Sequence, residues 1–252
     1  MPDTPRKRPR RKKRARGALF APLAFLIICA ALVFAMSVFF RVSRITVTGN
    51  ALYTEEEITT AAGIEKGDNL FFINRFSAIA RIRARLPYIE TVSIERALPN
   101  RVTITVSESR AIAYVTAETG CWVIDRGCKL LTQATTEEMA SLIRVDGITP
   151  IAPAVGDQVA AGEAEAAKVT YLAQILDQLQ QRGMEGDVTY IDVSTSANPS
   201  FDYLQRFTVK LGSMENTEYK FGILLSAVSQ LTQGDTGTID LSIDKRAHFS
   251  PE

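Results

Sequence analysis

The longest uninterrupted apolar stretch of the chain runs from residue 18 to residue 40. It has 23 residues and no charged side chain. A helix rises about 1.5 Å per residue, so this stretch is long enough to cross the roughly 30 Å hydrocarbon core of a bilayer. The alternative is a cleaved signal peptide, whose apolar core usually has only about 7–15 residues. The pattern therefore predicts one transmembrane helix that stays attached to the protein.

In residues 41–110 the hydrophobic pattern changes between two periods. Apolar and polar residues alternate in ITVT, and again on both sides of the turn at 98–100, which predicts three half-buried strands. Two helices lie between the first and second strands. The first has a capping box of Thr54 and Glu57, and the second ends at Pro87. This order predicts a small α+β module in which two helices cover one face of a three-stranded sheet.

In residues 112–252 strand-like alternation is interleaved with two helical periods. We expect strands within 111–131, 188–193, 207–211 and 239–243, and helices from 163 to 182 and from Asn216 to just before Gly234. These elements predict one larger, twisted, mostly antiparallel sheet with helices on one face. The expected fold class is α+β, preceded by a single membrane helix.

Positive charge is concentrated just before the apolar stretch, where RKRPRRKKRAR carries nine Lys and Arg in eleven residues. Basic residues that flank a membrane helix stay on the cytoplasmic side. The cluster therefore indicates a cytoplasmic N-terminus, with everything after the helix outside. A nucleic-acid-binding arm is the alternative, but such an arm would need no hydrophobic neighbour. The residues of this topology signal are Arg10, Arg11, Lys12, Lys13, Arg14 and Arg16.

The rest of the chain has the opposite net charge. Residues 1–40 hold nine of the 29 Lys and Arg but only one of the 28 Asp and Glu, which leaves 20 cations and 27 acids in residues 41–252. The resulting formal charge of −7 excludes a broadly basic surface that attracts nucleic acid. We expect no nucleic-acid partner for this part.

Three cysteines occur, and Cys29 lies in the apolar stretch. Cys121 and Cys128 flank WVIDRG, which indicates two short strands around a turn. Outside the cytoplasm such a hairpin would bring two thiols close enough for a disulfide, and two free thiols are the equally weighted alternative. A metal site is not expected, because the spacing matches no ligand pair and His248 is the only histidine.

No combination of residues indicates catalysis. His248 has no nucleophile motif beside it, and the acids Asp192, Asp240 and Asp244 occupy polar positions of alternating strands. GIEKGDNLF lacks the residues and spacing of a phosphate-binding loop. The sequence therefore predicts a protein that is not an enzyme and needs no cofactor.

Several stretches together resemble one known family. ITVTGN, TEEEI, GDNLF and LPYIETVSIERALPNRVTITVSE are similar to the POTRA domain of the FtsQ/DivIB family of bacterial division proteins. DVTYIDVS, RFTVKLG, EYKFGILLSAV and GTIDLSIDKRAHFSP resemble that family's second domain, in the family's order. The resemblance implies four regions: a basic cytoplasmic tail in 1–17, a transmembrane helix in 18–40, a POTRA domain in 41–110 and a β domain in 111–252.

The stretch GTIDLSIDK at 237–245 is expected to form a terminal strand. The pattern alone leaves open whether this strand is well paired or forms an exposed edge that accepts a partner strand. The resemblance favours the edge, because in this family the last strands receive a small coiled-coil protein called FtsB or DivIC. The partner-binding residues that the resemblance implies are Ile239, Leu241, Ile243, Lys245, Arg246 and Phe249.

The function that the resemblance implies is non-enzymatic. The protein would be a single-pass component of the division septum that binds FtsL- and FtsB/DivIC-like proteins outside the membrane, and through them influences the septal peptidoglycan synthase and transpeptidase. Two other functions are possible for a chain with these regions. A POTRA-bearing outer-membrane assembly component would need many barrel strands in place of the two helices. A membrane-anchored cell-wall hydrolase would need a metal or nucleophile constellation.

Overall fold

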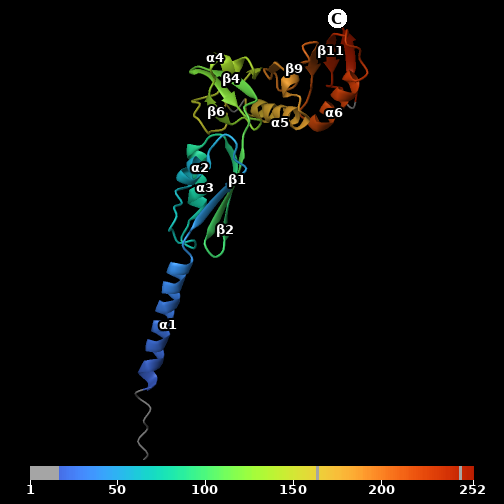
Figure 1. The fold of residues 1–252 in the computed structure, drawn as a ribbon. Coiled ribbons are helices and arrows are strands. Elements are labelled where there is room, and N and C mark those ends of the chain that lie inside the picture. Colours follow the sequence, from blue (N-terminus) through green and yellow to red (C-terminus); the bar gives the residue numbers. More distant parts are fainter. Residues whose placement is uncertain (1–16, 163–164, 244–245) are drawn as a thin grey trace, which may run out of the picture.

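The computed structural model describes residues 17–162, 165–243 and 246–252. The basic topology residues Arg10, Arg11, Lys12, Lys13, Arg14 and Arg16, and the expected partner residue Lys245, lie outside the described residues. Helix α1 (Gly17–Phe39) comes first and is followed by a small three-stranded module and then by a nine-stranded sheet (Figure 1). Among the residues described, α1 alone is long and apolar enough to cross a membrane.

The three-stranded module has the predicted order of elements. Its elements are β1 (Arg44–Thr48), α2 (Glu55–Ala62), α3 (Arg75–Arg85), β2 (Ile89–Ala97) and β3 (Arg101–Glu108). Strand β3 lies in the middle of the sheet, where it pairs in parallel with β1 and antiparallel with β2. The two helices and the sheet enclose a core in which Ile58, Leu70, Ile82 and Ile104 are completely buried.

Local hydrogen bonds explain why the two helices of this module begin where they do. The predicted capping box is present at α2, where the backbone N–H of Glu57 donates to Thr54 Oγ1 (3.2 Å) and that of Thr54 donates to Glu57 Oε2 (2.8 Å). At α3 the backbone N–H of Ser77 donates to Asn74 Oδ1 (3.1 Å), which makes Asn74 the N-cap. Helix α2 ends at Gly63, which adopts the left-handed conformation.

The second part of the chain forms one mixed sheet of nine strands. Its strand order is β12-β11-β10-β9-β8-β7-β4-β5-β6, and five of the eight strand pairs are antiparallel. The strands are β4 (Ala113–Ala117), β5 (Gly120–Ile124), β6 (Leu130–Gln133), β7 (Ile143–Asp146), β8 (Tyr190–Asp192), β9 (Ser200–Tyr203), β10 (Phe207–Lys210), β11 (Gly237–Asp240) and β12 (His248–Pro251).

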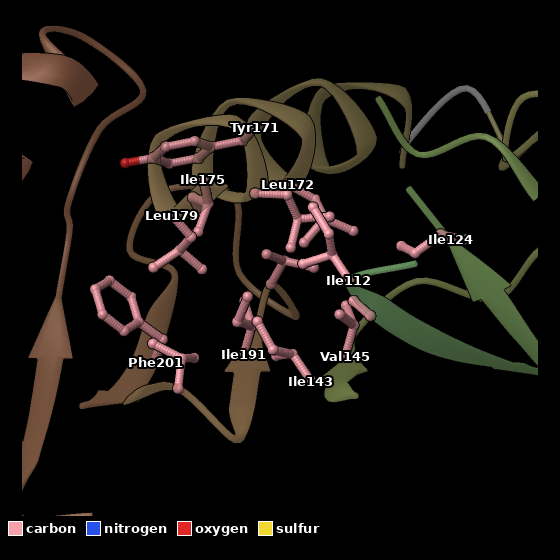
Figure 2. Packing of buried hydrophobic residues seen from close by; sticks show 14 of the residues in the cluster. Ile112, Ile124, Ile143, Val145, Tyr171, Leu172, Ile175, Leu179, Ile191 and Phe201 are labelled. Atoms are coloured by element: carbon pink, nitrogen blue, oxygen red, sulfur yellow. The ribbon is translucent and has the colours of Figure 1, made fainter. Parts of the chain in front are cut away.

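Helices α5 (Ala166–Arg182) and α6 (Thr217–Val228) pack on the core of this sheet, while α4 (Thr136–Met139) and the 3-10 turn η1 (Glu185–Asp187) are short connections. Figure 2 shows Tyr171, Leu172, Ile175 and Leu179 of α5 facing strand residues such as Ile191. The larger α+β part therefore has the predicted layering of a sheet covered by helices.

The C-terminal elements differ from the expectation. The predicted strand at 237–245 ends at Asp240, and an additional strand, β12, follows it. Helix α6 ends at Val228, and Asn216, the expected N-cap, makes no side-chain capping bond. The alternating residues of β11 were identifiable, whereas HFSP is too short to show a period, ends in proline and has three exposed residues of four.

The two sheets meet at the turn between β5 and β6. Arg126 Nη2 lies 2.6 Å from Glu90 Oε1 in β2, and its Nη1 lies 3.3 Å from Asp177 Oδ1 in α5. Lys129 Nζ donates to the backbone carbonyl of Ile89 (2.9 Å). The hydrogen bond to Glu90 is the main cause that raises the pKa of Arg126. A single turn thus connects the small module to the nine-stranded sheet.

We expect Gly49→Ala to destabilise the three-stranded module more than Gly67→Ala. Both glycines have positive φ, so alanine at either position costs about 1–2 kcal/mol in backbone strain. Only at Gly49 would a Cβ overlap the carbonyl oxygen of Val106, which adds a further cost of about 1–3 kcal/mol. Amide hydrogen exchange in β1 and β3 measures the difference, and equal exchange in the two variants would contradict the overlap.

We expect Arg126→Ala to loosen the orientation of the two sheets without unfolding either one. Its ion pairs are partly exposed, so the free energy of unfolding should change by less than about 1 kcal/mol. The matched control is Arg144→Ala, which removes an exposed pair with Asp146 inside β7. Spin-label distances between α2 and α6, measured with the native cysteines replaced, should broaden only in the Arg126 variant. An unchanged distribution in that variant would exclude this role.

Candidate partner-binding surface

Strand β12 forms one outer edge of the nine-stranded sheet. Strand β11, which the sequence predicted as the terminal edge, lies inside the sheet between β10 and β12. At the opposite outer strand, β6, the segment 156–159 covers the start of the edge: the N–H of Leu130 donates to the carbonyl of Asp157, and the carbonyl of Leu130 accepts from the N–H of Gly156, each at 2.8 Å. No strand within the described residues covers the outer side of β12.

The expected partner-binding residues fall into three groups. Ile239 and Leu241 are core residues with 0 and 2% exposure, so their side chains are not available at the surface and their expected direct contact with a partner does not fit this fold. Ile243 and Arg246 are exposed, and Lys245 lies outside the described residues. Phe249 is half-buried, with its ring edge-on to Phe207 at a centroid distance of 6.1 Å. Its side chain therefore belongs partly to the core.

The backbone of β12 provides the free edge. Glu252 N–H donates to the carbonyl of Thr236 (3.1 Å), and hydrogen-bonded pairs alternate along an antiparallel ladder. Residues 248 and 250 therefore bond to β11, whereas the N–H and C=O of Phe249 point away from it. The next outward position is Pro251, which has no N–H to donate. A strand added at this edge would have to align on Phe249.

A groove of about 830 Å³ lies beside β12 along the outer face of α6. Gly222 and Ser226, which are about one helical turn apart, both line it, and small residues at this spacing let another chain approach closely. Tyr219, which is 53% exposed, and Arg246 line it as well. The sequence predicted α6 but not this surface, because the inward-facing apolar residues of the helix give the stronger pattern.

The charges around the groove and the edge are mixed. Arg182 is fixed by hydrogen bonds to Gln178 Oε1 (3.1 Å) and to the carbonyl of Glu218 (3.0 Å), while Arg246 has no ion-pair partner among the described residues. Burial raises the pKa of Asp240, but hydrogen bonds from Ser242 and the charge of Lys210 outweigh it and leave this pKa below its ordinary value. The exposed arginine is suited to an acidic side chain of a partner.

The smaller sheet has outer strands of its own. Strand order β1-β3-β2 leaves the outer sides of β1 and β2 unpaired within the part of the chain that the structure describes. Strand β1 at 44–48 is therefore an outer strand next to the end of α1. Its neighbouring glycine and asparagine serve the fold, since Asn50 Nδ2 donates to the carbonyl of Tyr53 (2.8 Å).

Other chemistry is not assembled in the described residues. His248 is exposed on β12, opposite Asp240 of β11, and no group of three or more His, Cys, Asp or Glu is placed to hold a metal ion in the part of the chain that is described. Asp192 and Asp240 instead accept hydrogen bonds from the backbone N–H groups two residues after them, both at 2.8 Å. These acids stabilise the ends of strands.

The two cysteines outside α1 are free thiols at opposite ends of the β5–β6 hairpin. The N–H of Cys128 donates to the carbonyl of Asp125 in the turn (3.0 Å), whereas Cys121 lies about 13 Å along the strand from Asp125 at 3.3 Å per residue. A disulfide needs Cα atoms within about 7 Å. The hairpin was predicted correctly, but the inference that it brings the thiols together was wrong.

We expect alkylation without reductant to modify Cys121 at least about tenfold faster than Cys128. Cys121 is partly exposed, whereas burial and then the nearby Asp125 raise the pKa of the Cys128 thiol. The unfolded chain loses this proton near pH 8.5 while the folded chain keeps it, so stability should fall as the pH rises above about 8.5. Peptide mass analysis locates the label, and two equally protected thiols that react only after reduction would restore the disulfide.

The comparisons with known proteins agree with this architecture. The POTRA domain, FtsQ-type, matches residues 40–109. Cell division protein DivIB of Clostridium botulinum is 25% identical over 243 residues, which cover 95% of this chain and 93% of the relative. The likeness to DivIB proteins runs along almost the whole chain, and the FtsQ-type domain coincides with the three-stranded module. DivIB of Bacillus subtilis is 22% identical over 94% of this chain and 85% of its own length.

Relatives named DivIB and relatives named FtsQ both match this chain. Cell division protein FtsQ of Corynebacterium glutamicum is 28% identical over 56% of this chain and 64% of its own length. A role in cell division is therefore what these relatives support. The three-stranded module is the POTRA domain of this chain, and α1, immediately before it, fits a membrane anchor.

Proposed function

We propose that this chain is an FtsQ/DivIB-type protein and a non-enzymatic scaffold of the division septum. It binds FtsL- and FtsB/DivIC-like coiled-coil proteins outside the membrane and links them to the septal peptidoglycan synthase and transpeptidase. The observation that carries the proposal is the uncovered outer edge of β12 beside the groove on α6. At the opposite outer strand, β6, the segment 156–159 already bonds to the first residue, Leu130, whereas no described segment bonds to the outer side of β12.

The proposed topology follows from the order of the regions. Residues 1–17 form the cytoplasmic tail, 18–40 the membrane anchor, 41–110 the POTRA domain and 111–252 the partner-binding β domain. The cluster of Lys and Arg before α1 supports a cytoplasmic N-terminus, since such residues resist translocation. In Figure 1, β11 and α6 lie at the end of the molecule farthest from α1. The binding edge is therefore held away from the membrane surface.

The proposed binding mode is strand addition. An incoming strand accepts the N–H of Phe249 and donates to its carbonyl, and each such bond contributes about 0.5–1.5 kcal/mol. Residues that continue from the added strand as a helix pack in the groove over Gly222 and Ser226. Arg246 lines the groove and would select an acidic partner, and Lys245 adds a second positive charge next to it in the sequence. Ile243, which is 58% exposed, supplies an apolar contact at the same end.

We expect Phe249→Pro to weaken binding of the FtsB/DivIC-like ectodomain about five- to tenfold relative to Phe249→Ala. Both variants lose the ring packed on Phe207, but only proline also removes the outward N–H of the β12 edge. The titration uses the full chain in nanodiscs and the partner from the same organism. A chain ending at Ala247, which lacks β12 but keeps Ile239 and Leu241, should not bind.

These variants separate two questions: whether the partner adds a strand at Phe249, and whether it binds at β12 at all. Equal affinities of the proline and alanine variants would exclude strand addition at Phe249. Full binding by the chain ending at Ala247 would move the interface away from β12, either to the outer strands of the POTRA domain or to the α6 groove alone.

A further inference from the structure

One end of the POTRA domain exposes several large apolar side chains. Phe72 and Phe76 are 86 and 83% exposed, Leu98 is 66% exposed and Phe71 is 40% exposed. These four residues, called here the membrane-proximal rim, come from the α2–α3 connection, the first turn of α3 and the β2–β3 turn. Figure 1 shows the connection and the turn at the end of the domain that faces α1. Such a cluster of exposed apolar side chains indicates a binding surface.

The rim is attached to the last turn of α1. Leu70 N–H donates to the carbonyl of Phe40 (2.8 Å), and Asn69 Nδ2 donates to the carbonyl of Met36 (3.2 Å). The ring of Phe71 packs edge-on against Phe40 at a centroid distance of 4.9 Å. On the other side, Ser43 N–H donates to the carbonyl of Asn100 in the β2–β3 turn (2.8 Å). These contacts keep the rim beside the helix end.

The length of α1 sets the depth of the rim. Its 23 residues extend about 34 Å at 1.5 Å per residue, slightly more than the roughly 30 Å of the hydrocarbon core. When the helix spans a bilayer, its last turn therefore lies among the lipid head groups. Groups that hydrogen-bond to Met36 and Phe40 lie at the same level.

Positive charge surrounds the rim. Four exposed arginines beside it have no ion-pair partner within the described residues; they are Arg41, Arg44, Arg75 and Arg101. A fifth, Arg96, is half-buried and donates to the carbonyls of Phe71 (3.4 Å) and Ile73 (2.8 Å). Arg44 and Arg101 are neighbours in the β1–β3 register, which places like charges side by side. The carboxylates of Glu65, Asp68 and Glu95 are nearby, so the arginines are in excess. This combination of apolar and basic groups is typical of surfaces that bind anionic lipid.

We propose that the membrane-proximal rim docks on the outer face of the membrane from which α1 emerges. Phe72, Phe76 and Leu98 enter the boundary between head groups and acyl chains, and the arginines contact lipid phosphates. The inference rests on the membrane anchor of the proposed function and is independent of partner binding at β12. Docking would fix the tilt of the POTRA domain, and therefore the height at which the β domain is presented.

The test places an indole in the rim of the full chain. Phe72→Trp and, separately, Phe76→Trp are reconstituted in vesicles of phosphatidylcholine, with and without phosphatidylglycerol, that carry brominated acyl chains. The native Trp122 is 6% exposed and lies in the β domain, so it supplies a constant background. The matched control is Tyr219→Trp, which is an exposed position on α6 far from α1. We expect several-fold stronger quenching in the rim variants than in the control, and more in the anionic vesicles.

Each outcome bears on the proposal. If the rim variants are quenched no more than the Tyr219 variant, membrane docking is overturned, and the rim is in contact with water or with a protein partner. Equal quenching in neutral and anionic vesicles would overturn the role of the arginines. Release of the chain by an alkaline wash would contradict the membrane anchor itself, on which this inference and the proposed function both depend. Loss of partner binding with normal quenching would affect only the proposed function.

Discussion

The position of the β12 edge depends on how the β5–β6 turn is held between the two sheets. Arg126 joins β2 of the POTRA domain to α5 of the β domain, and Lys129 bonds to the backbone of β2. Such partly exposed polar contacts add little to the free energy of unfolding, but they restrict the orientation of the POTRA domain relative to the β domain. Because the POTRA domain is in turn bonded to the end of α1, the contacts form a continuous path from the membrane helix to the outer strand. A scaffold that works by positioning needs this path more than it needs a deep pocket.

The parts of the fold that the sequence predicted correctly are those fixed by local physics. The capping box of Thr54 and Glu57 requires only neighbouring residues, and so does the left-handed stop at Gly63. Alternation in β1 and β3 reflects one buried and one exposed face, which a sequence shows directly. The uninterrupted apolar stretch of α1 is equally local. Family resemblance added the order of the domains, which no local pattern contains.

The parts that were missed depend on long-range pairing. Strand β11 pairs in parallel with β10 across the whole of α6, so its neighbours on both sides are set by the fold and not by its own residues. Ile239 and Leu241 were expected at a partner surface because a terminal strand was taken to be an edge. One more strand, which has only four residues and is too short to show a period, reverses that conclusion. The expectation that Cys121 and Cys128 lie close together was also wrong, because the hairpin places them at its opposite ends.

If β12 binds a partner as proposed, its composition explains how an exposed edge could serve one partner and not pair with many other chains. Unprotected strand edges pair with other copies of themselves, and proteins limit this with short strands, charge and proline. Strand β12 has only four residues, begins with His248 beside Arg246 and Ala247, and ends in Pro251, which offers no outward N–H. Within β12, only Phe249 offers an added strand both an outward N–H and an outward C=O. Most of the specificity must then come from beside the strand, where the α6 groove and Arg246 provide a surface that a second copy of the short β12 strand would not fill.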